Sequence, residues 1–123
     1  MYQYSFEKLD VWKRAILLSK EIYLQTKKFP ETEKFSLISQ IRRASVSVTA
    51  NIAEGSARST AREKQRFYQI AYGSLMEVLN FLILSRELKY LSEEDYLMDR
   101  SLVNEVANKL NALSKSEDRK RSQ

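Results

Sequence analysis

Four stretches of the chain place apolar residues three and four positions apart, the spacing that gives an α-helix one apolar face. The second stretch contains Ser45–Thr49, which alternates like a strand over five residues, but the helical spacing extends through the whole stretch. Four helices joined by short connections favour antiparallel neighbours. The sequence therefore predicts an all-α fold, an antiparallel up-down-up-down four-helix bundle. The four stretches are residues 9–28, 33–55, 60–88 and 92–114.

Local signals mark the ends of these predicted helices. Pro30 stops the first, because the residue before a proline is pushed out of the helical region. Gly55 suits a left-handed cap after the second helix. Thr60 and Glu63 form a capping-box pattern at the start of the third helix, and Ser92 precedes acidic residues at the start of the fourth. These signals agree with the boundaries that the apolar spacing predicts.

Small residues predict where two helices approach each other closely. The second helix is rich in Ala and Ser, so we expect it to be central and heavily contacted. Gly73 lies in the middle of the third helix, where Gly costs about 1 kcal/mol relative to Ala. A close helix crossing at Gly73 and Ser74 would account for this cost.

The chain divides into three parts. Residues 1–8 form an N-terminal segment, and residues 9–114 form the bundle. Residues 115–123 contain no apolar residue and four Lys/Arg, so we expect a disordered basic tail. A chain of 123 residues hides roughly two-thirds of its unfolded surface, which is enough for one core.

The composition excludes several classes of enzyme. The chain has two Gly and one Pro, too few for the many tight turns of a β-sandwich or a doubly wound α/β fold. It has no His and no Cys, which excludes a triad with a His base, sites with His ligands, thiolate nucleophiles and disulfides. No Gly-rich phosphate loop is present. We therefore expect no catalytic site, no cofactor and no small-molecule substrate, although an enzyme that uses only carboxylates, Lys or Tyr stays open.

The longest apolar runs contain four residues, far fewer than the ~20 that cross a bilayer. The first eight residues lack the apolar core of a signal peptide. We expect no membrane association and a cytoplasmic protein.

The net charge of +5 is unevenly distributed along the chain. Residues 1–66 carry thirteen Lys/Arg and seven Asp/Glu, whereas residues 67–114 carry four and seven. Arginine can hold phosphate oxygens in two parallel hydrogen bonds, so the densest cluster is a candidate nucleic-acid-binding surface. A solvated helix face is the alternative. Tyr68 and Tyr72 could stack on bases, but tyrosines in a bundle more often belong to the core or an interface. The cluster consists of Arg42, Arg43, Arg58, Arg62, Lys64 and Arg66.

A second group of polar residues lies among small and apolar ones. Asn51 and Glu54 belong to the second predicted helix, and Glu77 belongs to the third. Two carboxylates on adjacent helices could act as an acid and a base or bind a metal. We favour a structural role, in which they accept hydrogen bonds from Arg42, Arg43 or free helix-end N–H groups, and we expect no metal site.

Several segments together resemble a known family, the bacterial four-helix bundle proteins encoded in intervening sequences of 23S ribosomal RNA genes, often labelled ribosomal proteins. The resemblance covers about residues 5–91. Thr49 stands where proline is common in the family, Leu79 where an acid is frequent and Lys89 where Gly often ends the third helix. The matching segments are Phe6–Trp12, Phe29 and Pro30 with Glu33 and Phe35, Gln40–Ala44, Asn51–Gly55, and Ala71–Ser74 with Glu77.

The resemblance implies an up-down bundle with no established enzymatic activity. The family is also similar to the accessory variability protein of diversity-generating retroelements, a basic five-membered ring that engages a reverse transcriptase and nucleic acid. By this analogy we expect a homo-oligomer, a pentameric ring. The leading hypothesis is a non-enzymatic oligomeric scaffold that binds RNA or a ribonucleoprotein through the arginine cluster. The alternative is a protein–protein adaptor with no direct nucleic-acid role.

Overall fold

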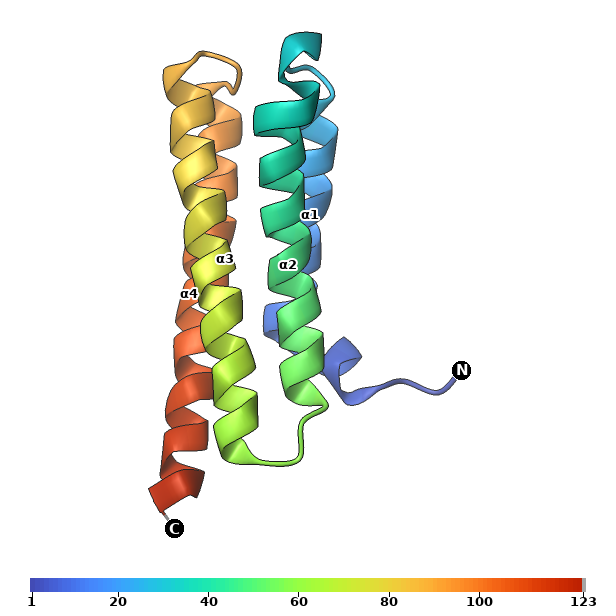
Figure 1. Cartoon of the computed structure of the whole chain (residues 1–123), viewed down its shortest axis with the longest axis vertical. Helices are drawn as coiled ribbons and strands as arrows, with labels where there is room; N and C mark the ends of the chain where they lie inside the picture. Colours follow the sequence, from blue (N-terminus) through green and yellow to red (C-terminus); the bar gives the residue numbers. More distant parts are fainter. Residues whose placement is uncertain (123) are drawn as a thin grey trace.

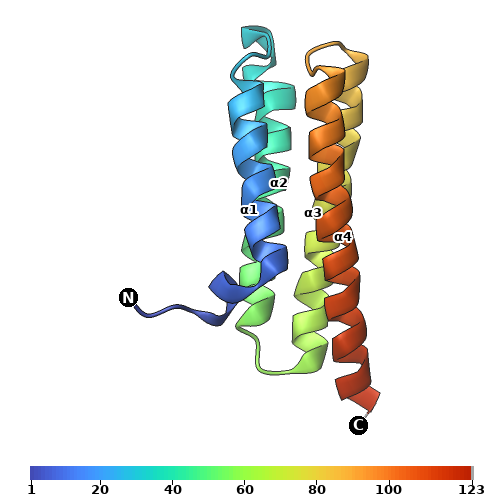
Figure 2. The same ribbon diagram turned by 180° about the vertical axis from the view of Figure 1, so that it is seen from behind.

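The computed structural model describes residues 1–122 and confirms an all-α, up-down-up-down four-helix bundle (Figure 1, Figure 2). Each helix packs against its two neighbours in the square, so α1 contacts both α2 and α4. The α2–α3 connection lies at the same end of the bundle as the end of α4, whereas the other two connections lie at the opposite end (Figure 1). The elements are η1 (Ser5–Lys8), α1 (Asp10–Thr26), η2 (Glu31–Glu33), η3 (Lys34–Ile38), α2 (Ser39–Ser56), α3 (Ala61–Glu87) and α4 (Glu93–Ser122).

The core is one continuous apolar cluster contributed by all four helices. Leu18, Ile52, Leu75 and Val106 are each at most 1% exposed. Burying a side chain of this size contributes about 1.5–3 kcal/mol, so such residues hold the helices together without disulfides. They recur at helical spacing, which explains why the strand-like alternation within α2 does not form a strand.

The predicted starts of α3 and α4 are confirmed by their capping bonds. The hydroxyl of Thr60 accepts a hydrogen bond from the backbone N–H of Glu63 at 3.1 Å. The hydroxyl of Ser92 accepts one from the N–H of Asp95 at 3.1 Å. Each bond satisfies a backbone donor that the helix itself leaves free.

The predicted left-handed cap at Gly55 is wrong. Gly55 lies inside α2, and no glycine has a positive φ among the described residues. A Cβ at Gly55 would lie 2.8 Å from Tyr68 Cε1, so this glycine makes room for an aromatic ring of α3. The left-handed residue is instead Lys89, with a φ of 63° after α3. The Tyr90 N–H bonds to the Ser85 carbonyl at 2.9 Å, as in a Schellman cap.

The predicted close crossing at Gly73 is also wrong, whereas Ser74 does lie at a helix contact. Gly73 is exposed, and a Cβ there would meet nothing within 4 Å. Ser74 is 8% exposed, and its hydroxyl lies 2.9 Å from that of Ser47 on α2. The α2–α3 contact therefore passes through Ser47 and Ser74, and Ser74 directly follows the glycine.

The expected disordered tail over residues 115–123 is wrong for its described part, because α4 continues to Ser122. Glu117 is 5% exposed and packs at the end of the bundle. Gln65 on α3 donates a hydrogen bond to the Ser114 carbonyl at 3.0 Å and another to the Asp118 carboxylate. Polar contacts with α3 thus extend α4 where no apolar residue remains, while residue 123 lies outside the described part.

By length and composition alone, α3 is the one described helix that could cross a membrane, with a window of mean hydropathy 1.3. Core helices of soluble proteins pass the same test, and α3 packs between α2 and α4. Only 33% of that window is buried, so α3 also presents apolar side chains on its outer face. This result gives no clear sign of a membrane protein.

Candidate nucleic-acid interface

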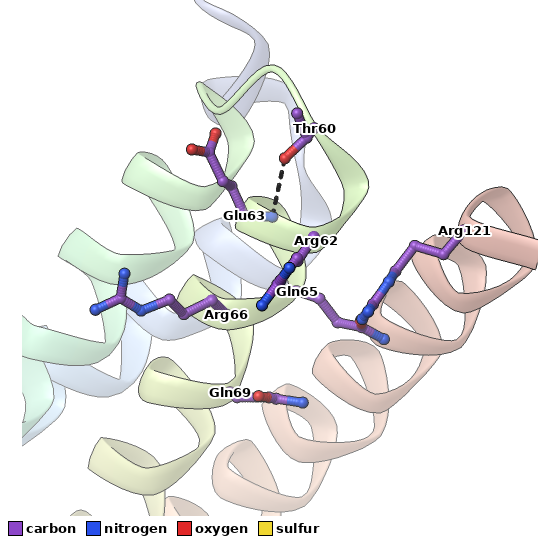
Figure 3. Close-up of a pocket in the computed structure, with 7 residues that line it drawn as sticks. All are labelled: Thr60, Arg62, Glu63, Gln65, Arg66, Gln69 and Arg121. Carbon is purple, nitrogen blue, oxygen red and sulfur yellow. Dashed lines mark hydrogen bonds between the residues drawn. The ribbon is translucent and has the colours of Figure 1, made fainter.

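A hollow of about 650 Å³ lies at the end of the bundle where α3 begins and α4 ends. The N-terminus of a helix carries free N–H groups and a partial positive charge, which favour anions nearby. Figure 3 shows the side chains around this hollow, which come from the first turns of α3 and the last turn of α4. They are Thr60, Arg62, Glu63, Gln65, Arg66, Gln69 and Arg121.

Gln65 connects the two helices at this hollow. It is 5% exposed, donates to α4 as described above, and its Oε1 accepts a hydrogen bond from Arg121. In Figure 3, Arg121 extends from α4 to Gln65, and Arg66 points away from Arg121. The buried amide therefore holds a third arginine beside the start of α3.

Arg62 and Arg66 are the two arginines of the predicted cluster that are best placed to bind an anion. Both are exposed and lie one turn apart on α3. Neither forms a salt bridge within residues 1–122, whereas Arg58 is paired with a carboxylate. Because their guanidinium groups are solvated and unpaired, they can take phosphate oxygens without breaking an internal contact.

Arg58 and Lys64 lie at the same end but also serve the fold. The Arg58 guanidinium pairs with Glu54 at 3.2 Å and stacks 4.6 Å from the centre of the Phe67 ring. The Lys64 ammonium donates a hydrogen bond to the Ser56 carbonyl at 2.8 Å, which satisfies an acceptor at the end of α2. Arg58 remains exposed enough to contact a ligand, and Lys64 is half-buried.

Arg42 and Arg43 do not join this surface. From Arg43 to its end at Ser56, α2 runs for roughly 20 Å, and Arg58 lies beyond that end. Arg42 Nε donates to the Thr26 hydroxyl at 2.9 Å, and its guanidinium lies 4.6 Å from the centre of the Tyr23 ring on α1. The predicted cluster of six therefore splits, because residues close in sequence lie at opposite ends of a long helix.

Of the three structural polar residues, Glu77 has an expected partner, whereas Asn51 and Glu54 have others. Asn51 donates a hydrogen bond to the Ser47 carbonyl one turn earlier at 2.8 Å. Glu77 accepts a hydrogen bond from Arg43 at 2.9 Å and so joins α3 to α2. Glu54 pairs with Arg58 of its own helix end rather than with Arg42 or Arg43.

The two carboxylates do not converge on one site. Arg43, the partner of Glu77, precedes Glu54 on α2 by roughly 16 Å of helix axis, so the carboxylates cannot act as an acid and base pair. No group of three or more acidic side chains that could hold a metal occurs within the described chain.

The two tyrosines beside the cluster are poorly placed for base stacking. Tyr68 is 4% exposed, and burial raises the pKa of its hydroxyl, with a further contribution from the charge of Glu117. Tyr72 is half-buried against the core. Tyr68 is therefore a core residue, and recognition at this end rests on cations.

Sequence reasoning missed Arg121, Gln65 and Gln69. The signal for Arg121 was present, since Leu110, Ser114, Glu117 and Arg121 continue the three- and four-residue spacing of α4. With Arg121, residues 54–66 and 115–121 hold eight Lys/Arg and four Asp/Glu. Residues 27–36 and 84–95, at the other end of the bundle, hold five Lys/Arg and six Asp/Glu. We call the end formed by residues 54–66 and 115–121 the basic end.

Comparison with known proteins agrees with this fold. No curated protein matches the sequence. A solved structure from Bacteroides thetaiotaomicron, described as a protein with unknown function from the S23 ribosomal protein family, superimposes with a TM-score of 0.77. It is 22% identical, and the alignment covers 85% of this chain and 98% of that one. The sequence model of the 23S rRNA-intervening sequence proteins matches residues 7–112, most of the length, and the chain belongs to this family.

Proposed function

We propose that this protein is a non-enzymatic oligomeric scaffold that binds RNA, free or within a ribonucleoprotein, through phosphate contacts at the basic end. Arg62, Arg66 and Arg121 are the principal contacts, and Arg58 contributes from the α2–α3 connection. Arg42 and Arg43, which belong to the sequence-based hypothesis, are left out of the interface. A cytoplasmic location and a ring of five chains are part of the same proposal.

One observation carries the proposal: two exposed, unpaired arginines lie one turn apart at the start of α3, with a third held beside them by a buried glutamine. Side chains one turn apart on a helix are about 5–6 Å apart at Cβ, close to the spacing of successive phosphates on a nucleic-acid strand. The positive end of the α3 dipole adds to the attraction. This arrangement favours the backbone of RNA over its bases, because no exposed aromatic side chain lines the hollow.

The test is binding of a single-stranded RNA, measured by fluorescence anisotropy over a range of salt concentrations. Three phosphate contacts predict a slope of log K against log salt of roughly −2, using the single-strand coefficient. Arg62→Glu with Arg66→Glu should reduce affinity at least tenfold and flatten the slope. The matched control is Lys28→Glu with Lys89→Glu, which changes charge equally on exposed residues at the other end.

Equal loss of binding in the control would mean that net charge, and not the basic end, attracts RNA. Undiminished binding by the Arg62→Glu, Arg66→Glu variant would refute the proposed interface.

The alternative of a protein–protein adaptor is favoured by one observation, the exposed apolar side chains at the opposite end, among which Phe35 is 88% exposed. A wild-type protein without measurable RNA affinity would leave this adaptor role as the better explanation.

A further inference from the structure

An aromatic side chain stands almost fully in solvent at the end of the bundle opposite the basic end. Phe35 belongs to η3 and is 88% exposed. It borders a shallow hollow of about 470 Å³ with Phe81 and Leu84 of α3 and with Leu88 directly after α3, and the two leucines are 43% and 45% exposed. We call these four side chains the Phe35 patch. Contiguous exposed apolar groups of this kind mark contact sites, because covering them releases water from apolar surface.

A matching groove runs along the outer face of α1. Its volume is about 420 Å³, and its lining is mainly apolar. Leu24 is 53% exposed and Tyr23 is 40% exposed, so the groove is uncovered in the single chain. It is lined by Ile16, Ser19, Lys20, Tyr23, Leu24 and Lys27.

The two surfaces carry opposite charge. Lys20 and Lys27 belong to the lining of the α1 groove. Glu33 lines the hollow beside Phe35, and Glu31 lies two residues before it. Two cations flank the patch, Lys34 beside Phe35, with its ammonium 5.6 Å from the centre of that ring, and Lys89 beside Leu88. Neither lines the hollow, whereas the carboxylate residue Glu33 does. Charge complementarity therefore favours contact between the Phe35 patch and the α1 groove over contact of either surface with itself.

One chain cannot close this contact internally. Phe35 faces the side of the bundle formed with α3, whereas the groove lies on the outer face of α1. Both surfaces lie toward the same end of the bundle, because the end of α1, η3 and the end of α3 are neighbours there (Figure 1). A second chain can thus dock beside the first with its axis in the same direction. Such contacts between two different surfaces build rings or filaments.

We propose that the Phe35 patch of one copy docks into the α1 groove of the next copy. This inference rests on the oligomeric scaffold proposed above and names its interface. The contact leaves the basic end uncovered and directs the basic ends of all copies to one side of the assembly. Several weak phosphate sites then act together on one RNA, which raises the overall affinity without any new contact.

The test is the mass of the intact protein at micromolar concentration, measured by light scattering after gel filtration. The wild type should form an assembly of several 14.4 kDa chains. Phe35→Asp removes the docking side chain, and Leu24→Asp adds a charge to the groove, so each variant should elute as a monomer. Leu97→Asp is the matched control, because Leu97 is a 57% exposed leucine on α4 outside both surfaces, and it should assemble as the wild type does.

Mixing the two monomeric variants separates this contact from other modes of assembly. The Leu24→Asp chain still has its Phe35 patch, and the Phe35→Asp chain still has its α1 groove. An equimolar mixture should therefore form dimers of one chain of each kind, and no larger species. A mixture that stays monomeric would overturn the pairing of these two surfaces. Far-UV circular dichroism confirms that both variants fold, as expected for exposed positions.

The outcomes distinguish failure of the interface from failure of the proposed function. An assembled Phe35→Asp variant would refute the interface and leave the scaffold in place. A monomeric wild type would refute both the interface and the oligomeric scaffold. RNA binding is measured separately, and the monomeric variants should keep a weaker affinity that still depends on Arg62 and Arg66.

Discussion

Replacing Asp99 by Asn is expected to stabilise the bundle at neutral pH. Asp99 lies on α4 and is fully buried against α1. Its Oδ1 accepts a hydrogen bond from Gln25 Nε2 at 3.0 Å, whereas its Oδ2 has no partner within residues 1–122. One hydrogen bond, with no cation beside the carboxylate, does not compensate for removing its charge from water.

The magnitude follows from the pKa of Asp99. Burial raises this pKa from 3.8 to about 7; the hydrogen bond from Gln25 opposes the shift, and the charges of Asp95 and Glu21 add to it. The unfolded chain loses the proton near its ordinary pKa, so the folded state binds more protons between about pH 4 and pH 7. The free energy of unfolding therefore falls across this window and is constant above it. A shift of about three units corresponds to about 4 kcal/mol.

The measurement is denaturant unfolding followed by circular dichroism from pH 4 to pH 8, at one protein concentration. Asp99→Asn should be more stable than the wild type by about 4 kcal/mol at pH 8, and this difference should vanish near pH 4. Groups with lowered pKa, such as Glu33 beside Ser36, affect both proteins alike and cancel in the difference.

Glu94→Gln is the matched control, because Glu94 is an exposed carboxylate on the same helix, and its removal should change stability by less than about 1 kcal/mol. The reasoning is refuted if Asp99→Asn gains no stability at pH 8. A gain that is independent of pH would equally contradict it, since the cost would then not come from ionisation.

Further predictions concern the glycines and the helix ends. Gly73→Ala should raise the free energy of unfolding by about 1 kcal/mol, because a Cβ there meets nothing within 4 Å. Gly55→Ala should lower it by about 1–3 kcal/mol through overpacking, and equal effects of the two changes in urea unfolding would contradict both. Lys89→Gly should raise the melting temperature by relieving the left-handed backbone at that residue, worth about 1 kcal/mol; a lower melting temperature would be the contrary result. Gln65→Leu should remove hydrogen-exchange protection from α4 beyond Ser114 and leave the rest of the bundle protected, whereas an unchanged pattern would show that other contacts hold this end.

The positions of the arginines illustrate how far sequence reasoning reaches at the candidate site. Arg62 and Arg66 were predicted as phosphate contacts from local charge density, and they do lie exposed together on α3. Arg42 belonged to the same predicted cluster, yet it is used in the contact between α1 and α2. Arg121 was missed, because its place beside α3 depends on the buried amide of Gln65. Charge density along a chain does not indicate which cations already have an internal partner.

The sequence alone determined the four helices, their direction and the absence of His and Cys chemistry. These properties depend on spacing, caps and composition, which are local and can be read along the chain. The Thr60 and Ser92 caps are of this kind, since each bond spans three residues.

Only the tertiary structure decided which residues meet across helices. It showed that Gly55 accommodates the Tyr68 ring while Gly73 stands free, and that α4 extends to Ser122 along α3. It also showed that Gln65 and Arg121, which are far apart in the sequence, form a hydrogen bond. The physical reason is that such contacts depend on the rotation and length of neighbouring helices. A periodic apolar face limits that rotation only to within about one residue, and one residue is the difference between a buried side chain and an exposed one.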